Sequence, residues 1–121
     1  MTLKVSGYSS TYAAYKVVND SDSDENAELD VTGSAGKIYQ IYIKNDAQSN
    51  SSYVKFKLTS GATTVGTTEP DLMLVAGPNT PQTYVFPTGL SFTQLTFWTT
   101  LNPATSDTTA PPSTDITILC T

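Results

Sequence analysis

GKIYQIYIKNDAQSNSSYVKFKLT (residues 36–59) contains two segments in which apolar and polar side chains alternate with the period of a β-strand. We expect the buried faces to carry Tyr39, Ile41, Ile43, Val54, Phe56 and Leu58. The opposite, wet faces would carry Ile38, Gln40, Tyr42, Lys44, Tyr53, Lys55 and Lys57. Residues 45–52 are mostly Asn, Asp and Ser, which favour turns because their side chains bond nearby backbone groups. The alternation therefore predicts a β-hairpin with one face in the core.

Composition points to one small all-β domain. The chain has 121 residues, is rich in Thr and Ser, and shows no run with helical apolar spacing. Its single cysteine, Cys120, excludes an internal disulfide and is expected to be a small buried hydrophobe. The net charge is −5 and every basic residue is a lysine, which argues against nucleic-acid binding. With no signal-like or 18-residue apolar segment, we expect synthesis in the cytoplasm and no membrane contact.

The N-terminal region has two interpretations. Residues 1–14 could form an arm that reaches a neighbouring molecule, or they could form an edge strand of the chain's own sheet. The following residues 15–121 are expected to form a single β-sandwich domain. Under the arm interpretation, the apolar and aromatic residues of the first segment, together with a tryptophan on a later strand, would contact the partner. These residues are Leu3, Val5, Tyr8, Tyr12, Tyr15 and Trp98.

The acidic stretch NDSDSDENAELD (residues 19–30) opens like a calcium-binding loop, with Asp20, Asp22 and Asp24 at alternate positions. Glu25 and Val31 stand where an EF-hand requires Gly and a bidentate Glu, so we predict a solvated loop without a metal. Residues 27–32 could form a short strand with Leu29 and Val31 inward.

The second half of the chain reads as further strands divided by turn residues. Strands are expected over residues 72–75, 82–86, 90–100 and 114–120, with Pro87-Thr88-Gly89 ending the second of them. Within residues 90–100 the apolar phase changes near Thr93, which requires a bulge or a turn. About eight strands without helices predict an antiparallel β-sandwich, Ig-like or a jelly roll. Its core would include Tyr39, Ile41, Ile43, Val54, Phe56, Leu58, Leu95, Phe97, Ile116 and Ile118.

The sequence contains few residues in arrangements that could carry out catalysis. The sequence has no histidine, which is the usual general base and metal ligand, and its glycines do not form a phosphate-binding loop. Glu69 and Asp71 are an acidic pair around a proline, and we interpret them as turn-forming residues rather than a glycosidase pair. We therefore expect no enzyme activity, no catalytic residues and no cofactor.

From residue 65 onward the chain resembles small virion proteins of tailed bacteriophages. The matching features are V-G-T-x-x-P-D before a short strand, then P-x-G-L-x-F, a W-x-T, and a Thr/Pro-rich loop before the last strand. With residues 36–64 included, the resemblance covers about residues 36–121 and leaves residues 1–35 without a family pattern. It implies a capsid decoration or cement protein that binds the major capsid protein on the virion surface, as a homo-oligomer.

A second class of function is a carbohydrate- or host-binding module of a tail or fibre accessory protein. Such modules bind sugars on exposed aromatic side chains that line a groove. Tyr42, Tyr53 and Trp98 would provide this platform if they lie on one outward face. The competing interpretation is that these aromatics cover the second face of a sheet.

Overall fold

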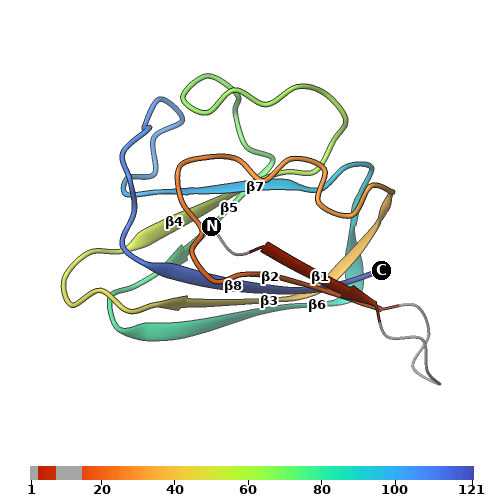
Figure 1. Ribbon diagram of the computed structural model, residues 1–121, viewed down its shortest axis with the longest axis horizontal. Helices are drawn as coiled ribbons and strands as arrows, with labels where there is room; N and C mark the ends of the chain where they lie inside the picture. The colour runs from red at the N-terminus through yellow and green to blue at the C-terminus, as the bar shows by residue number, and fades with distance from the viewer. Residues whose placement is uncertain (1–2, 8–14) are drawn as a thin grey trace.

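The protein, described by a computed structural model over residues 3–7 and 15–121, is an all-β sandwich. The described residues form β1 (Leu3–Gly7), β2 (Lys16–Asp20), β3 (Gly36–Asn45), β4 (Ser52–Lys57), β5 (Leu72–Ala76), β6 (Thr80–Phe92), β7 (Thr96–Thr100) and β8 (Thr114–Cys120). One sheet has the strand order β1-β2-β8-β3-β6 and the other has β5-β4-β7, and all pairs are antiparallel (Figure 1). The two antiparallel sheets confirm the predicted fold class.

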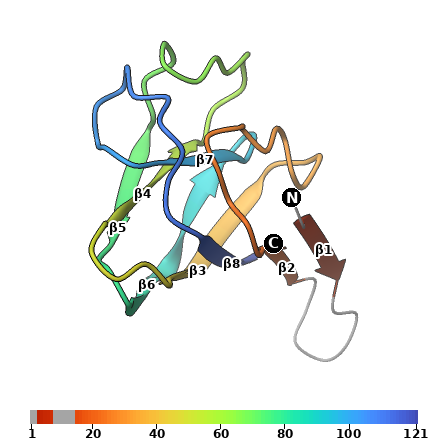
Figure 2. The ribbon, with the colours of Figure 1, turned by 60° about the vertical axis from the view of Figure 1, so that its left-hand side comes forward.

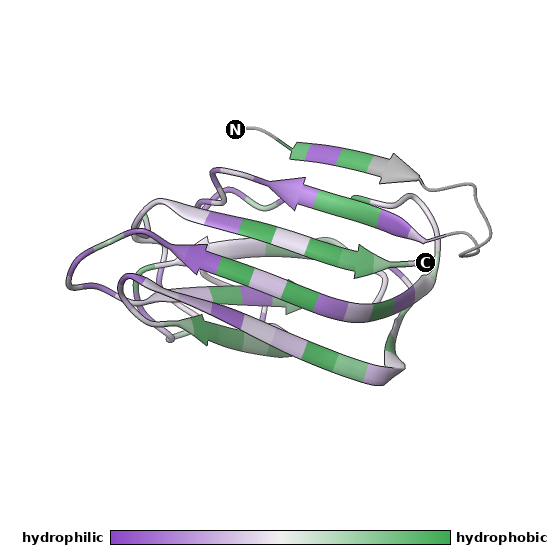
Figure 3. Cartoon of the chain, turned by 90° about the horizontal axis from the view of Figure 1, so that it is seen from below, coloured by the Kyte–Doolittle hydropathy of each residue, from purple (hydrophilic) through white to green (hydrophobic). Residues whose placement is uncertain are grey.

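The core lies between the two sheets and is filled by alternate residues of their strands. Figure 3 shows the alternation of apolar and polar residues along the five-stranded sheet. In β8, for example, Ile116, Ile118 and Cys120 are buried, while Asp115, Thr117 and Leu119 are only partly covered. Phe56 from β4 packs against Phe97 from β7, with ring centroids 6.1 Å apart. Nine of the ten predicted core residues are buried, all except Tyr39.

The predicted hairpin of residues 36–59 is wrong. β3 pairs with β6 and β8 in the five-stranded sheet, whereas β4 pairs with β5 and β7 in the three-stranded sheet. The polar residues 46–51 therefore connect the two layers instead of turning one strand back on the other. Asn45 helps to hold this connection, because its side-chain amide donates to the carbonyl oxygens of Asn50 (2.8 Å) and Ala76 (3.2 Å). Alternation predicts a strand's buried face but does not choose its partner.

A bulge in β3 corrects the predicted face of its first residues. Ile38 pairs with Cys120 and Gln40 with Leu119, so Tyr39 is an extra residue relative to β8. An extra residue shifts the alternation by one position. Ile38 therefore joins Ile41 in the core, and Tyr39 is only half-buried.

β6 continues through Pro87-Thr88-Gly89, where the sequence predicted a break. Its register against β3 jumps from Val85 to Leu90 across the same bulge, so the four residues 86–89 stand opposite Tyr39 alone and have no partner in the regular ladder. The phase change near Thr93 is a turn between β6 and β7, one of the two predicted alternatives.

Residues 23–31 run along the outer edge of β7 instead of forming the predicted strand over residues 27–32. Glu28 and Phe97 exchange backbone hydrogen bonds, and Thr99 donates to the carbonyl oxygen of Asp24 at 2.8 Å. Val31 packs partly against the core, but Leu29, predicted inward, is exposed. This segment covers an edge of the three-stranded sheet that would otherwise be open.

Candidate interaction surfaces

β1 is the edge strand of the five-stranded sheet, which supports the edge-strand interpretation for residues 3–7. It pairs on one side with β2, in the register Leu3 to Asp20 and Val5 to Val18, and no strand of the described residues pairs with its other side, the free edge (Figure 2). Leu3 packs partly against the core, while Val5 is 46% exposed. Tyr8 and Tyr12, predicted interface residues, lie outside the described residues. Among the predicted interface residues, the structure therefore places Leu3 and Val5 together on an open sheet edge.

Tyr15 lies immediately before β2 and contacts Tyr39 in the bulge of β3. The two rings meet edge to face, with centroids 5.6 Å apart and planes at 80°. This geometry is favourable because the positive edge of one ring meets the negative face of the other. The contact gives Tyr15 a packing role within the domain.

The three aromatics of the predicted sugar platform do not lie on one surface. Tyr42 is on the outer face of the five-stranded sheet, since its neighbours Ile41 and Ile43 point inward. Tyr53 and Trp98 are on the outer face of the three-stranded sheet, on the other side of the sandwich. Trp98 is also only 1% exposed. Its ring is therefore not open to a sugar, as the platform requires, or to a partner protein, as the interface requires.

Lys55, which the sequence placed on a wet face, is fully buried beside Trp98. The two residues are cross-strand partners, and the Lys55 ammonium donates to the carbonyl oxygen of Ala104 at 2.7 Å. Burial lowers the pKa of Lys55, and the negative charge of Asp107 opposes that shift. The indole N–H of Trp98 has no hydrogen-bond partner among the described residues. A lysine between two apolar residues of a strand carries no sequence signal for such burial.

The loop that covers this face, residues 101–113, is held together by Asp107. Its carboxylate accepts hydrogen bonds from the backbone N–H of Asn102 (2.9 Å) and from the hydroxyl of Thr109 (2.7 Å). These bonds favour the charged form and hold the pKa of Asp107 below its usual range, with the Thr109 bond the largest cause. The predicted long Pro/Thr-rich loop is thus an internally bonded cover over Lys55.

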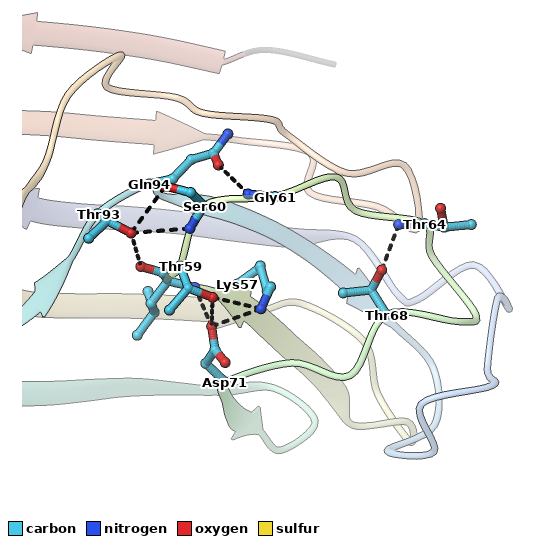
Figure 4. A network of polar contacts seen from close by, with 10 residues as sticks. Lys57, Thr59, Ser60, Gly61, Thr64, Thr68, Asp71, Thr93 and Gln94 are labelled. Atoms are coloured by element: carbon cyan, nitrogen blue, oxygen red, sulfur yellow. Dashed lines mark hydrogen bonds and ion pairs between the residues drawn. The ribbon is translucent and has the colours of Figure 1, made fainter.

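A second loop, residues 58–71, is fastened by the Asp of the V-G-T-x-x-P-D motif (Figure 4). The Asp71 carboxylate accepts from the backbone N–H of Leu58 at 2.7 Å and pairs with the Lys57 ammonium at 3.7 Å. The Thr93 hydroxyl accepts from the N–H of Ser60 at 3.1 Å, and Gln94 accepts from the N–H of Gly61 at 3.1 Å. Asp71 therefore caps a backbone N–H, as the sequence indicated, but that N–H lies at the other end of the loop and not in a neighbouring turn.

The acidic segment contains two carboxyls whose surroundings disfavour charge. Asp20 is buried and one of its carboxylate oxygens lacks a hydrogen-bond partner among the described residues. Burial is the main cause that raises the pKa of Asp20 and of Glu28, with repulsion from neighbouring carboxylates adding to it. Within residues 3–7 and 15–121, no group of three or more His, Cys, Asp or Glu is arranged to hold a metal ion.

Exposed large apolar side chains gather on the edge strands. They are Val5 on β1, Met73 and Val75 on β5, and Val85 on β6, with Leu29 on the segment that covers β7. Cys120 is buried in the core, and burial raises the pKa of its thiol, which disfavours the reactive thiolate. The features of this surface that could bind a partner are therefore the exposed apolar side chains of the edge strands.

The chain matches no protein family, no curated protein and no solved structure. Among the described residues, no helix is long and apolar enough to cross a membrane.

Proposed function

We propose that the chain is a structural protein of a tailed-phage virion, a decoration or cement protein that binds the outside of the coat lattice. The observation that carries the proposal is the free edge of β1, where Val5 is 46% exposed beside the buried Val18 of β2. An edge strand offers unpaired backbone N–H and C=O groups to another chain, and an exposed apolar side chain adds fit.

Two further features support this assignment. The quoted motifs resemble those of small phage virion proteins, and Asp71 of one motif fastens the loop of residues 58–71. The residue content also suits a structural role, because histidine is absent and Cys120 is buried.

The docking edge can be tested with two matched charge substitutions. Val5→Lys places a charge on the free edge of β1, and Val85→Lys places one on β6, at the opposite edge of the same sheet. Both side chains are exposed, so both variants should fold. We expect the wild type and Val85→Lys to co-sediment with capsids assembled from the coat protein of the same virus, and Val5→Lys to bind at least about tenfold more weakly.

Each other outcome has a definite meaning. If the wild type does not sediment with capsids, the proposed function is wrong. If Val5→Lys binds as well as the wild type, the capsid contact lies elsewhere than the edge of β1. Binding of the isolated protein to a glycan array, without capsid binding, would favour the carbohydrate-binding alternative.

A further inference from the structure

β5 is the edge strand whose own sequence has the fewest features that block pairing, although the Tyr84 hydroxyl bonds one carbonyl of its free edge. Its sequence, LMLVA (residues 72–76), has no charge, no proline and no bulge, and β4 pairs with only one side of it. By contrast, β1 carries Lys4, and the free edge of β7 is covered by residues 23–31. β6 carries Pro81 and Pro87 and the large register jump. Folded proteins normally blunt their edges with such devices.

The hydrogen bond of Tyr84 shows which way the backbone of β5 points. The Tyr84 hydroxyl, from β6, donates to the carbonyl oxygen of Val75 at 2.6 Å. That carbonyl therefore points away from β4. The N–H and C=O of one strand residue point to the same side, and those of the next residue but one follow them. Met73 and Val75 thus direct their backbone groups to the free edge, where a carbonyl can accept a second hydrogen bond.

Side chains beside this edge are apolar as well. Met73 and Val75 are 41% and 42% exposed on the outer face of the three-stranded sheet. Tyr53, the cross-strand partner of Val75, stands next to them and is half-buried. Leu72, Leu74 and Ala76 point to the core side. A strand added here would extend both the outer apolar patch and the inner core face.

We infer that β5 pairs with the β5 strand of a second copy of this chain, antiparallel and about a two-fold axis, to join two three-stranded sheets into one of six strands. The charges near β5 are compatible with a second copy in the antiparallel orientation. The acidic residues near β5, Glu69 and Asp71, both precede it, and residues 77–80 that follow it are uncharged. Antiparallel pairing therefore places the acidic end of one strand against the neutral end of the other and avoids like charges face to face.

Val75→Lys tests the pairing, with Val85→Lys as the control on an edge of the other sheet. Both residues are exposed valines, and the two variants have the same net charge. We expect sedimentation equilibrium of the full chain, from micromolar to millimolar concentration, to show a dimer for the wild type and for Val85→Lys. In a two-fold dimer both copies place the substituted residue in the interface. Val75→Lys should therefore weaken dimerisation at least about tenfold.

Val75→Pro separates strand pairing from side-chain contact. The N–H of Val75 points to the free edge, so proline removes no ladder bond to β4 but does remove a donor to the partner. We expect a folded monomer, and in the wild type we expect slower hydrogen exchange of the Met73 and Val75 amides as concentration rises. Circular dichroism checks the fold.

Three results would overturn the inference. A wild type that stays monomeric at millimolar concentration excludes the dimer. A dimer that survives Val75→Lys, or that Val85→Lys weakens equally, uses another surface. A dimer that Lys disrupts and Pro leaves intact is held by side chains and not by paired strands. None of these results depends on capsid binding.

Discussion

Lys55 shows how one residue can contradict a correct strand pattern. It sits between Val54 and Phe56, whose side chains are buried in the core, yet it is equally buried on the other side of the sheet. Its partner is the single carbonyl of Ala104, in a loop almost fifty positions away. A buried ammonium with one acceptor is costly, because the hydrogen bond replaces only part of its hydration.

We expect Lys55→Met to leave the free energy of unfolding at neutral pH unchanged or to raise it by about 1 kcal/mol. Methionine keeps the apolar stem and removes the charge, and the carbonyl of Ala104 can turn to water because Ala104 is exposed. Chemical denaturation measures the effect. Lys55→Ala, which leaves a cavity, should instead cost about 2 kcal/mol or more.

Lys55→Met should also change how the free energy of unfolding depends on pH. Because burial lowers the pKa of Lys55 in the folded protein, the unfolded chain binds more protons on it. The free energy of unfolding therefore rises with pH between the lowered pKa and the ordinary value of 10.5. Lys55→Met should remove this rise and Lys57→Met should keep it. An unchanged pH profile in Lys55→Met would contradict the assignment.

At the scale of elements, bulges and connections decide which residues meet. The bulge in β3 moves Ile38 into the core and turns Tyr39 toward Tyr15. Its counterpart in β6 needs Gly89, whose φ of +83° is a conformation that side chains rarely adopt. A β-carbon there would also lie 2.7 Å from Cδ of Lys37 and 3.1 Å from the ring of Tyr39.

Gly89→Ala should lower the free energy of unfolding by about 1–3 kcal/mol, because it adds strain at a positive φ and crowds the Lys37 and Tyr39 side chains. Gly77→Ala is the matched control, since a β-carbon at Gly77 has nothing within 4 Å. Thermal and urea unfolding of the two variants measure the difference. Equal stability of both would mean that the β6 bulge tolerates a side chain.

At the scale of the whole molecule, the two sheets depend on each other through one shared core. Phe56 is fully buried, and it contacts Phe97 from the neighbouring strand of its own sheet. β4 is the central strand of the three-stranded sheet, so a cavity at Phe56 weakens its packing against both neighbours and the facing sheet.

Phe56→Ala should therefore cost about 3–5 kcal/mol, a large part of the stability of a domain of this size. We expect one cooperative unfolding transition at a much lower denaturant midpoint, followed by tryptophan fluorescence of Trp98 and by circular dichroism. Tyr42→Ala, on the outer face of the other sheet, serves as control and should cost less. Two separate transitions would show that the sheets fold independently.

Alternation of apolar and polar residues by itself determined the all-β fold class and most of the core. In a sandwich one face of each strand packs against apolar side chains, and this requirement shows in neighbouring residues of a single strand. Alternation assigned Ile41, Phe56 and Ile118 to the core correctly. The tertiary structure alone decided that β3 and β4 lie in different sheets, that Tyr39 is an extra residue, and that Lys55 is buried and bonded to a loop almost fifty positions away. Strand partners, bulges and loop covers depend on contacts between residues far apart in the chain, and a local pattern carries no record of them.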